Sequence, residues 1–541
     1  MFRLIPRSTA HLTALGKPRL RPLDWNFPIT AIRANQVSNI WWSTYLHSST
    51  HPFLVEQFVS WSSTSRPSES EEAAKNELVE GDIAHSSCLP IATTDQDQRE
   101  NNGSATTGRL VTLRTFLVHA LKLHSPIVQL DLKAAFHHLV PSSQQDPSDQ
   151  RPGDLCSNLD SSQKTPSPAA AAPKWTPTSR CKKLATWLED HQLKQSKSDP
   201  CLYLGHRFHV FFLTDSILVI GDIESFKAQI LGPRFSNMPN LHEVDTILGI
   251  QIRRKADSNS LYLSQPKQIN KALSELKMLD EEGVGDVGTP LTPKLQLVEA
   301  SDEEHEDFLQ KGMNYRQSVG LLNHIASTTR PDVMYASSSL SQFTEKPGTS
   351  HWGELMRCWR YLKATEQKAL ELAIRPTGFD LEVWSDANWA GDPVSRKSHS
   401  GYLVCLHGSC ISWNSARQST VSLSSTESEL RALVEATQEL IWLQRLLVEL
   451  NNTCPSPSNQ KSTLSHMNYI DNNALACSLA SASFHSKTKH IDVQTKWLRE
   501  HVHTKLLSYQ WIPTKSMLAD CLTKPAPKAA YSLLCAKVSL N

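Results

Sequence analysis

The chain has 541 residues, in which 55 Lys and Arg balance 54 Asp and Glu. This balance excludes a protein that binds nucleic acid through overall positive charge, so any such binding must come from local patches. Eleven cysteines without CxxC pairs or zinc-type spacing are typical of reduced thiols, and no apolar run approaches the roughly 20 residues of a membrane span. We therefore expect an intracellular chain, in the cytoplasm or nucleus, that does not enter a membrane.

The first 105 residues contain no pattern of a folded domain. Basic residues precede the first acid, Asp24, as in a mitochondrial presequence, but three prolines in that span oppose an amphipathic helix, and we do not expect one. Residues 60–102 are rich in Ser, Glu, Asp and Gln. Such a composition buries too little apolar surface to offset ordering, which predicts that residues 1–105 are largely disordered.

The middle of the chain alternates between patterned and unpatterned segments. Residues 142–180 are rich in Ser, Pro, Gln and Ala, show no helical or strand periodicity, and are predicted to be a disordered insert. On either side lie apolar runs such as SPIVQLDL and FFLTDSILVIGD. Across the whole chain, the pattern supports two folded domains.

Toward the C-terminus, the elements can be placed in order. LEVWSDA predicts a strand ending near Asp386, and GYLVCLHGSCISW predicts two strands joined at His407 and Gly408. Ser424 or Thr426, each with a Glu three residues later, can cap the long amphipathic helix that follows.

The rest of this region completes a mixed sheet. HMNYID predicts a strand ending at Asp471; a short helix, the helix IDVQTKWLREHV, the strand LLSYQWI and a last helix containing Asp520 follow. The order βββαβααβα predicts an α/β domain with a mixed five-stranded sheet and flanking helices. This is the element order of a ribonuclease H domain.

Four carboxylates in this region come from separate elements: Asp386, Glu429, Asp471 and Asp520. Two-metal phosphodiester cleavage needs acids that converge on two divalent cations about 4 Å apart. Hard oxygen ligands favour Mg²⁺, with Mn²⁺ as a substitute. Each acid alone is more often a cap or a turn residue, so the prediction depends on all four together. Glu427 competes with Glu429 for the glutamate position.

The segment from WSDANWAG through SSTESELRAL, YIDNNAL, SKTKHIDVQTKWLRE and LADCLTKP resembles the ribonuclease H domain of copia-type retrotransposon polyproteins. The resemblance implies that the four acids bind metal, with Glu429 favoured over Glu427 because Leu-Arg-Ala follows it. It also implies a basic segment with Lys487, Lys489 and His490, which would grip phosphates or place a proton-transferring histidine. A solvated basic start of a helix remains an equal alternative.

Upstream, the chain resembles the reverse transcriptase of the same polyproteins, most densely from Tyr315 to Thr365 in the family's connection region. The resemblance implies that Asp131 and Asp215 are metal-binding and that Phe136 lies under the nucleotide sugar, although core packing is the alternative for Phe136. Ser216 stands where the family has a second aspartate, so one charged ligand is missing. The family's Tyr-Gly-Leu-Lys-Gln segment is not found, which predicts a degenerate polymerase.

These observations define the expected domains and function. The expected fold is α/β and α+β, a partial right-hand polymerase (palm, thumb and connection) followed by the ribonuclease H-like domain. The boundaries are residues 1–105 unassigned, 106–310 degenerate reverse transcriptase with the insert, 311–375 connection, 376–527 ribonuclease H-like and 528–541 tail.

The expected function is two-Mg²⁺ cleavage of RNA in RNA–DNA hybrids beside an inactive polymerase. The alternatives are an active RNA-directed DNA polymerase and a non-catalytic relic that at most binds nucleic acid. The partner is an RNA–DNA hybrid or RNA template, without a small-molecule cofactor, and the sequence does not indicate an oligomeric state. The segment from about residue 365 onward is expected to fold alone.

Overall fold

The computed structural model describes residues 108–131, 185–213, 216–231, 242–255, 259–279, 287–453, 464–480 and 489–540. All described residues belong to one compact unit of the chain, residues 95–541. The segments 1–105 and 142–180, expected to be disordered, lie outside the described residues. None of the described helices combines the length and the apolar character needed to cross a membrane.

The described part of the chain before residue 244 forms a six-stranded sheet, in the order β2-β3-β4-β5-β1-β6. Its inner strands β4 and β5 are continuous apolar runs, FHVFF and SILVIG, and nearly every residue of them is buried, as expected for strands covered on both faces. The strands are β1 (Ile127–Asp131), β2 (Lys194–Gln195), β3 (Leu202–Leu204), β4 (Phe208–Phe212), β5 (Ser216–Gly221) and β6 (His242–Glu243). Helix α4 (Ile223–Phe226) and the π-helical turn η4 (Lys227–Leu231) follow β5.

A second sheet, in the order β10-β9-β8-β7, joins two distant parts of the chain. Strands β7 (Thr246–Ile247), β8 (Ile250–Arg254) and β9 (Ser260–Ser264) precede a helical layer, and β10 (Leu370–Ala373) returns after it to pair with β9. The helices are α5 (Pro266–Glu275), α6 (Asp302–Gln310), α7 (Tyr315–Thr328), η6 (Pro331–Val333), α8 (Met334–Ser341) and α9 (Thr349–Ala364). Trp359 lies at the centre of this layer, fully buried, and donates to the Ser318 hydroxyl at 2.9 Å.

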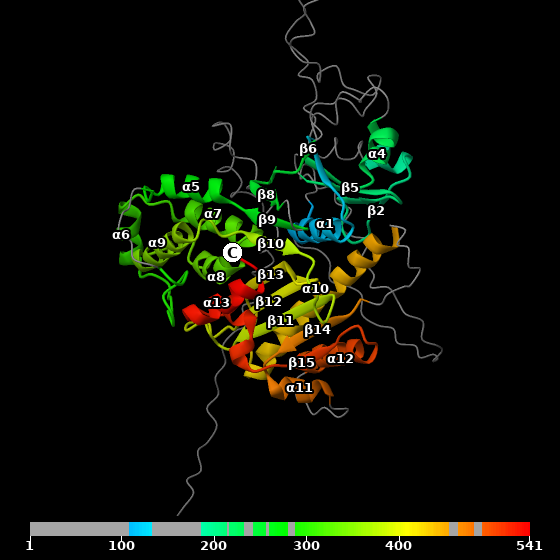
Figure 1. The fold of residues 1–541 in the computed structure, drawn as a ribbon. Helices are drawn as coiled ribbons and strands as arrows, with labels where there is room; N and C mark the ends of the chain where they lie inside the picture. The colour runs from blue at the N-terminus through cyan, green and yellow to red at the C-terminus, as the bar shows by residue number, and fades with distance from the viewer. Residues whose placement is uncertain are drawn as a thin grey trace, which may run out of the picture. The chain divides into compact units, whose positions relative to one another are not determined.

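The third sheet has five strands in the order β13-β12-β11-β14-β15 (Figure 1). Strands β11 (Leu381–Asn388), β12 (His399–Leu406) and β13 (Ser409–Arg417) are antiparallel, whereas β14 (His466–Ile470) and β15 (Tyr509–Trp511) run parallel to β11. His407 and Gly408 join β12 to β13 with φ of 47° and 79°, as a two-residue hairpin turn of the mirror-image type requires. The mixed five-stranded sheet expected from the sequence is confirmed, and its order is that of a ribonuclease H-like fold.

Helices complete this third layer: α10 (Ser425–Thr453), α11 (Asn473–Ala480), α12 (Lys489–His503), η7 (Thr514–Ser516), η8 (Leu518–Leu522) and α13 (Lys528–Lys537). Of the two candidate caps of α10, Ser424 is the one used, because its hydroxyl accepts from the Glu427 amide at 3.1 Å. The segment taken from the sequence as a tail forms α13, whose Tyr531 and Leu534 are buried. Beyond it, Leu540 bridges to Leu370 of β10.

Helix α1 (Leu110–Lys122) ties the upstream part to the third sheet. Its residues from Thr112 to Leu121 are all buried, so it has no solvated face and packs against both β10 and β13. Arg114, 3% exposed, lies at the centre of this contact, with its guanidinium carbon 4.0 Å from the centroid of the Trp413 ring. The guanidinium donates to three carbonyl oxygens, those of Ile411 (2.6 Å), Ser327 (3.0 Å) and Thr328 (2.9 Å).

A second set of contacts joins α10 to the first sheet. Trp442 donates to the Ser198 carbonyl at 3.0 Å, and the Glu449 carboxylate accepts from the Ser198 hydroxyl at 2.7 Å. Arg109 stacks over Trp442 at 4.1 Å. Because one hydrophobic core runs through both sheets, this packing is a reason against the expectation that the segment from residue 365 folds alone.

Buried histidines predict that the fold is sensitive to acid. Burial lowers the pKa of His119 to about 3 and that of His209 to about 4, and their rings stack 5.8 Å apart. In the unfolded chain both titrate near 6.5, so the stability that comes from keeping them neutral is complete above about pH 6.5 and is lost as the pH falls toward 4. At pH 4, one such histidine lowers the free energy of unfolding by roughly 3 kcal/mol relative to pH 7.

Urea denaturation at pH 7 and pH 5 measures this effect. The variant His119→Leu is expected to lose less stability on acidification than the natural chain. This comparison is needed because buried carboxyl groups with a raised pKa, such as Glu435 at about 7, act in the opposite direction. Equal losses in the two proteins would show that His119 is not a source of acid sensitivity.

Candidate metal centre

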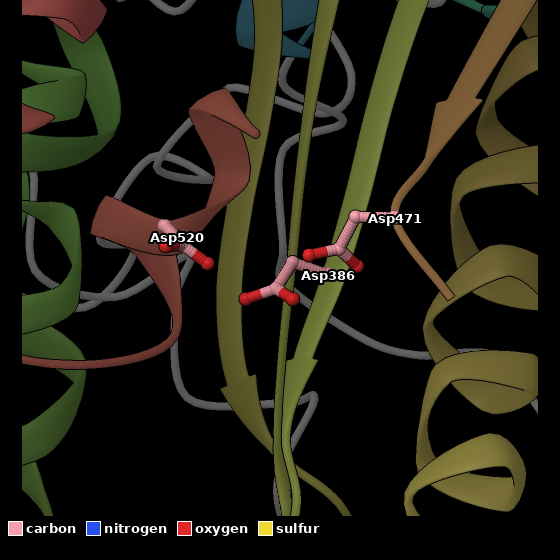
Figure 2. A group of neighbouring side chains, drawn as sticks. All are labelled: Asp386, Asp471 and Asp520. Carbon is pink, nitrogen blue, oxygen red and sulfur yellow. The ribbon is translucent and has the colours of Figure 1, made fainter. Parts of the chain in front are cut away.

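Three carboxylates meet at one edge of the third sheet. Asp386 lies near the end of β11, Asp471 directly follows β14, and Asp520 lies in η8. Because β11 and β14 are parallel neighbours, their carboxyl ends meet at the same edge. One oxygen from each of the three carboxylates lies within 4.8 Å of the others. Figure 2 shows Asp386 and Asp471 side by side, with Asp520 directed toward them from the opposite side.

The centre of this group is Asp386, which is 3% exposed. Burial, and then the charge of Asp520, raises the pKa of Asp386 to about 7. The Thr523 hydroxyl donates to Asp386 Oδ2 at 2.5 Å, and Lys524 Nζ lies 2.8 Å from Asp520 Oδ1. The hydroxyl orients one carboxylate, and the ammonium group partly offsets the repulsion among the three.

Glu429 lies beside the group but is not one of the three with oxygens within 4.8 Å. Burial, followed by the charges of Asp386 and Asp471, raises its pKa to about 10, although its carboxylate accepts a hydrogen bond from the Ala387 amide. Glu427, the competing glutamate, is bound to the Leu423 amide at 2.8 Å and to Arg431 at 2.8 Å. Its carboxylate therefore stabilises the start of α10.

The donor set fits a divalent cation. All four groups offer hard carboxylate oxygens, which suit Mg²⁺ better than a soft metal. The raised pKa values of Asp386 and Glu429 mean that ionising these carboxyl groups destabilises the folded chain at neutral pH. A bound cation reverses that cost, so the cluster is compatible with metal binding.

The other residues expected at functional sites are only partly described. His490 and Lys489 lie in the first turn of α12, and Asp131 ends β1, but their side chains are outside the described part. Lys487, Phe136 and Asp215 lie outside the described residues altogether. Ser216, in register with Asp131 on the neighbouring strand, is 6% exposed and accepts from Gln129 Nε2 at 3.0 Å. Ser216 and Gln129 therefore form a neutral hydrogen-bonded pair beside the end of β1.

Two residues of the centre were not expected from the sequence. Thr523 and Lys524 follow Asp520 by three and four positions within LADCLTKP. A threonine and a lysine in such a segment are common without any function. Only their contacts with Asp386 and Asp520 reveal their part in the site.

These features define a ribonuclease H-like domain with a carboxylate cluster, preceded by a part that resembles a polymerase. The chain is 31% identical over 450 residues to a retrovirus-related Pol polyprotein from transposon TNT 1-94 of Nicotiana tabacum, covering 79% of this chain and 32% of the relative. It is 32% identical over 366 residues to that from transposon RE2 of Arabidopsis thaliana, covering 66% of this chain and 24% of the relative. The chain belongs to the copia-type retrotransposon Pol polyproteins, and it spans at most about a third of the length of these relatives.

No family model matches the chain. Among solved structures, a foamy viral protease-reverse transcriptase in complex with an RNA/DNA hybrid aligns with a TM-score of 0.35 and 12% identity, over 72% of this chain and 44% of that chain. The assignment of the ribonuclease H-like fold stands on the strand order and on the element order described above.

Proposed function

We propose that the ribonuclease H-like domain cleaves the RNA strand of RNA–DNA hybrids with two Mg²⁺ ions. The observation that carries this proposal is the meeting of Asp386, Asp471 and Asp520 within 4.8 Å at the carboxyl edge of the sheet. Such a cluster of carboxylates from separate elements is costly to the fold without a cation. Family membership supports the choice of an RNA–DNA hybrid as substrate.

In this proposal the three aspartates and Glu429 hold the ions. Magnesium bound there supplies an activated water and stabilises charge on the phosphate. Thr523 keeps the Asp386 carboxylate oriented, and Lys524 offsets charge at Asp520. Lys487 and Lys489 would hold phosphates, and His490, in the first turn of α12, would transfer a proton.

The test is cleavage of a labelled RNA–DNA duplex by the full chain over a Mg²⁺ titration. Cleavage of the RNA strand that depends on Mg²⁺ and stops with EDTA supports the proposal. Single-stranded RNA and duplex DNA serve as controls. Cleavage of all three substrates alike would indicate a different nuclease, and no cleavage by folded protein would favour the non-catalytic relic.

We further propose that the polymerase part is inactive, so the full chain is expected not to extend a DNA primer on an RNA template. Ser216 is neutral and accepts a hydrogen bond from Gln129. One cation would therefore lack a charged ligand at the place where the charge of the triphosphate must be neutralised. Because the sequence also lacks the family's segment before Lys182, Ser216→Asp alone should not restore synthesis. Primer extension above background by the unmodified chain would instead establish the active polymerase.

A further inference from the structure

A polar groove of about 880 Å³ opens beside the carboxylate cluster. The described residues that form it come from segment 291–299, from α8 and the turn after it, and from loop 389–397 between β11 and β12. Asn388 and Lys524 line it, and the same Lys524 contacts Asp520 at 2.8 Å. Lys524 therefore links one edge of the groove to the carboxylate cluster.

The charged side chains that line the groove carry a net positive charge. Six lysines and arginines face three carboxylates. Three of the cations are in ion pairs, since Lys346 pairs with Asp302, Arg417 with Asp392 and Lys524 with Asp520. The other three form no ion pair with any described carboxylate: Lys294, Arg396 and Lys397. These charges are available to an anionic ligand.

Hydrogen bonds to Asp392 brace the loop that carries two of these charges. Asp392 accepts from the amides of Val394 and Ser395 at 2.9 and 3.0 Å and from Arg417 at 2.7 Å. Ala390 and Arg396 have φ of 49° and 55°, a region that non-glycine residues rarely adopt. A loop held in this unusual backbone conformation presents its side chains at fixed positions, as ligand-binding loops do.

Trp389 presents a large ring on this loop to solvent. It is 48% exposed, and its Nε1 donates to the Ser422 carbonyl at 2.9 Å, so the ring is anchored at one edge. An exposed aromatic ring beside unpaired cations suits a strand of nucleic acid, because a sugar or an unpaired base packs on the ring and phosphates meet the cations. An acidic peptide would use the charges without needing the ring.

We propose that this groove binds one strand of the RNA–DNA hybrid, with a sugar of that strand, or an unpaired base at its end, on the face of Trp389 and phosphates at Arg396 and Lys397. It thereby positions the hybrid relative to the carboxylate cluster. This inference rests on the proposed function, since it names residues that hold the substrate of that same site. Trp389, Arg396 and Lys397 are positioning residues, because they act on the cut site through the bound strand.

Binding is measured with the full chain carrying Asp386→Asn, so that the hybrid stays uncut. Fluorescence anisotropy of a labelled RNA–DNA hybrid is followed at several salt concentrations in Mg²⁺. Trp389→Ala is expected to weaken binding about tenfold, whereas Trp389→Phe, which keeps the ring face, keeps most of the affinity. The double change Arg396→Glu and Lys397→Glu is expected to weaken binding and to lower the salt slope by about two units.

The matched control is Lys267→Glu with Lys271→Glu, the same charge change on exposed positions of α5 away from the groove. It is expected to leave the affinity within about threefold of the parent. Equal effects of the two charge reversals, or unchanged affinity in Trp389→Ala, would overturn the proposal and favour a protein ligand for the groove.

Cleavage by the natural chain separates this inference from the proposed function. If hybrid binding depends on Trp389 but no RNA is cleaved, the groove proposal holds and the nuclease proposal is wrong. If RNA is cleaved, and neither Trp389→Ala nor the double charge reversal changes the rate or the cut positions, the nuclease proposal holds and the groove proposal is wrong.

Discussion

In the full chain, Asp386→Asn is expected to lower the rate of RNA cleavage in a hybrid more than about 100-fold. Removing a group that only supports a metal ligand costs up to about 100-fold, and the loss of a ligand itself should exceed that. Asn has nearly the volume of Asp but no charge to hold a cation. Asp471→Asn is expected to act in the same way, because its carboxylate shares the cluster. Initial rates with labelled hybrid in excess Mg²⁺ measure both losses.

The same substitution is expected not to destabilise the folded chain. Burial and Asp520 raise the pKa of Asp386 to about 7, so at pH 8 its ionised form is less favourable in the folded than in the unfolded state. Removing the charge removes that cost. Without Mg²⁺, the melting temperature of Asp386→Asn should equal or exceed that of the natural chain. Added Mg²⁺ should raise the melting temperature of the natural chain more than that of the variant.

Asp380→Asn is the matched control. Asp380 directly precedes β11, at the end opposite to Asp386, and accepts from the Ser465 amide and hydroxyl at 2.9 and 2.8 Å. Its substitution should cost about 1 kcal/mol of stability and leave the cleavage rate within about twofold. Natural rates in Asp386→Asn, or an equal loss in Asp380→Asn, would show that the carboxylate cluster is not the nuclease site.

The positions of Asp386 and Asp471 follow from local pattern. Each aspartate lies at or just after the end of a strand whose apolar residues can be read from the sequence. The long helix α10 between β13 and β14 supplies the crossover that a parallel strand needs. Once that crossover is recognised, both aspartates are expected at one edge of the sheet.

The surroundings of Asp520 could not be predicted from the sequence in this way. The sequence suggests that Asp520 lies in the last helix, whereas it lies in the short 3-10 helix η8, which ends at Leu522 and is separated from α13 by Pro525 and Pro527. The hydrogen bond from Thr523 to Asp386 joins residues 137 positions apart. No local periodicity records such a pair, because it depends on how the whole sheet packs.

The packing partners of helix α1 could not be predicted from the sequence either. Its segment RLVTLRTFLVHALK is apolar on most sides, which indicates burial but not the partner that buries it. The structure places Arg114 against β13 and α7, with no carboxylate accepting from its guanidinium among the hydrogen bonds of the described residues. This contact leads to the second large effect that we expect.

Arg114→Ala is expected to destabilise the full chain by about 3 to 5 kcal/mol. The substitution leaves the carbonyl oxygens of Ile411, Ser327 and Thr328 without their donor. Each buried polar group left unpaired costs about 1 to 3 kcal/mol, and the loss of packing on Trp413 adds to this. Urea denaturation measures the loss, and the fraction of soluble protein should fall with it.

Arg109→Ala is the control for the Arg114 substitution, because Arg109 also lies over a tryptophan, at 4.1 Å from the centroid of Trp442, but its side chain is 50% exposed. It should cost less than about 1 kcal/mol, as exposed cation–π contacts and ion pairs do. The same reasoning predicts that the isolated segment 365–541, which lacks α1, is aggregated or molten, because Ile411 and Trp413 of β13 are then uncovered. If that segment folds cooperatively, and Arg114→Ala costs no more than Arg109→Ala, the ribonuclease H-like domain does not depend on the upstream part.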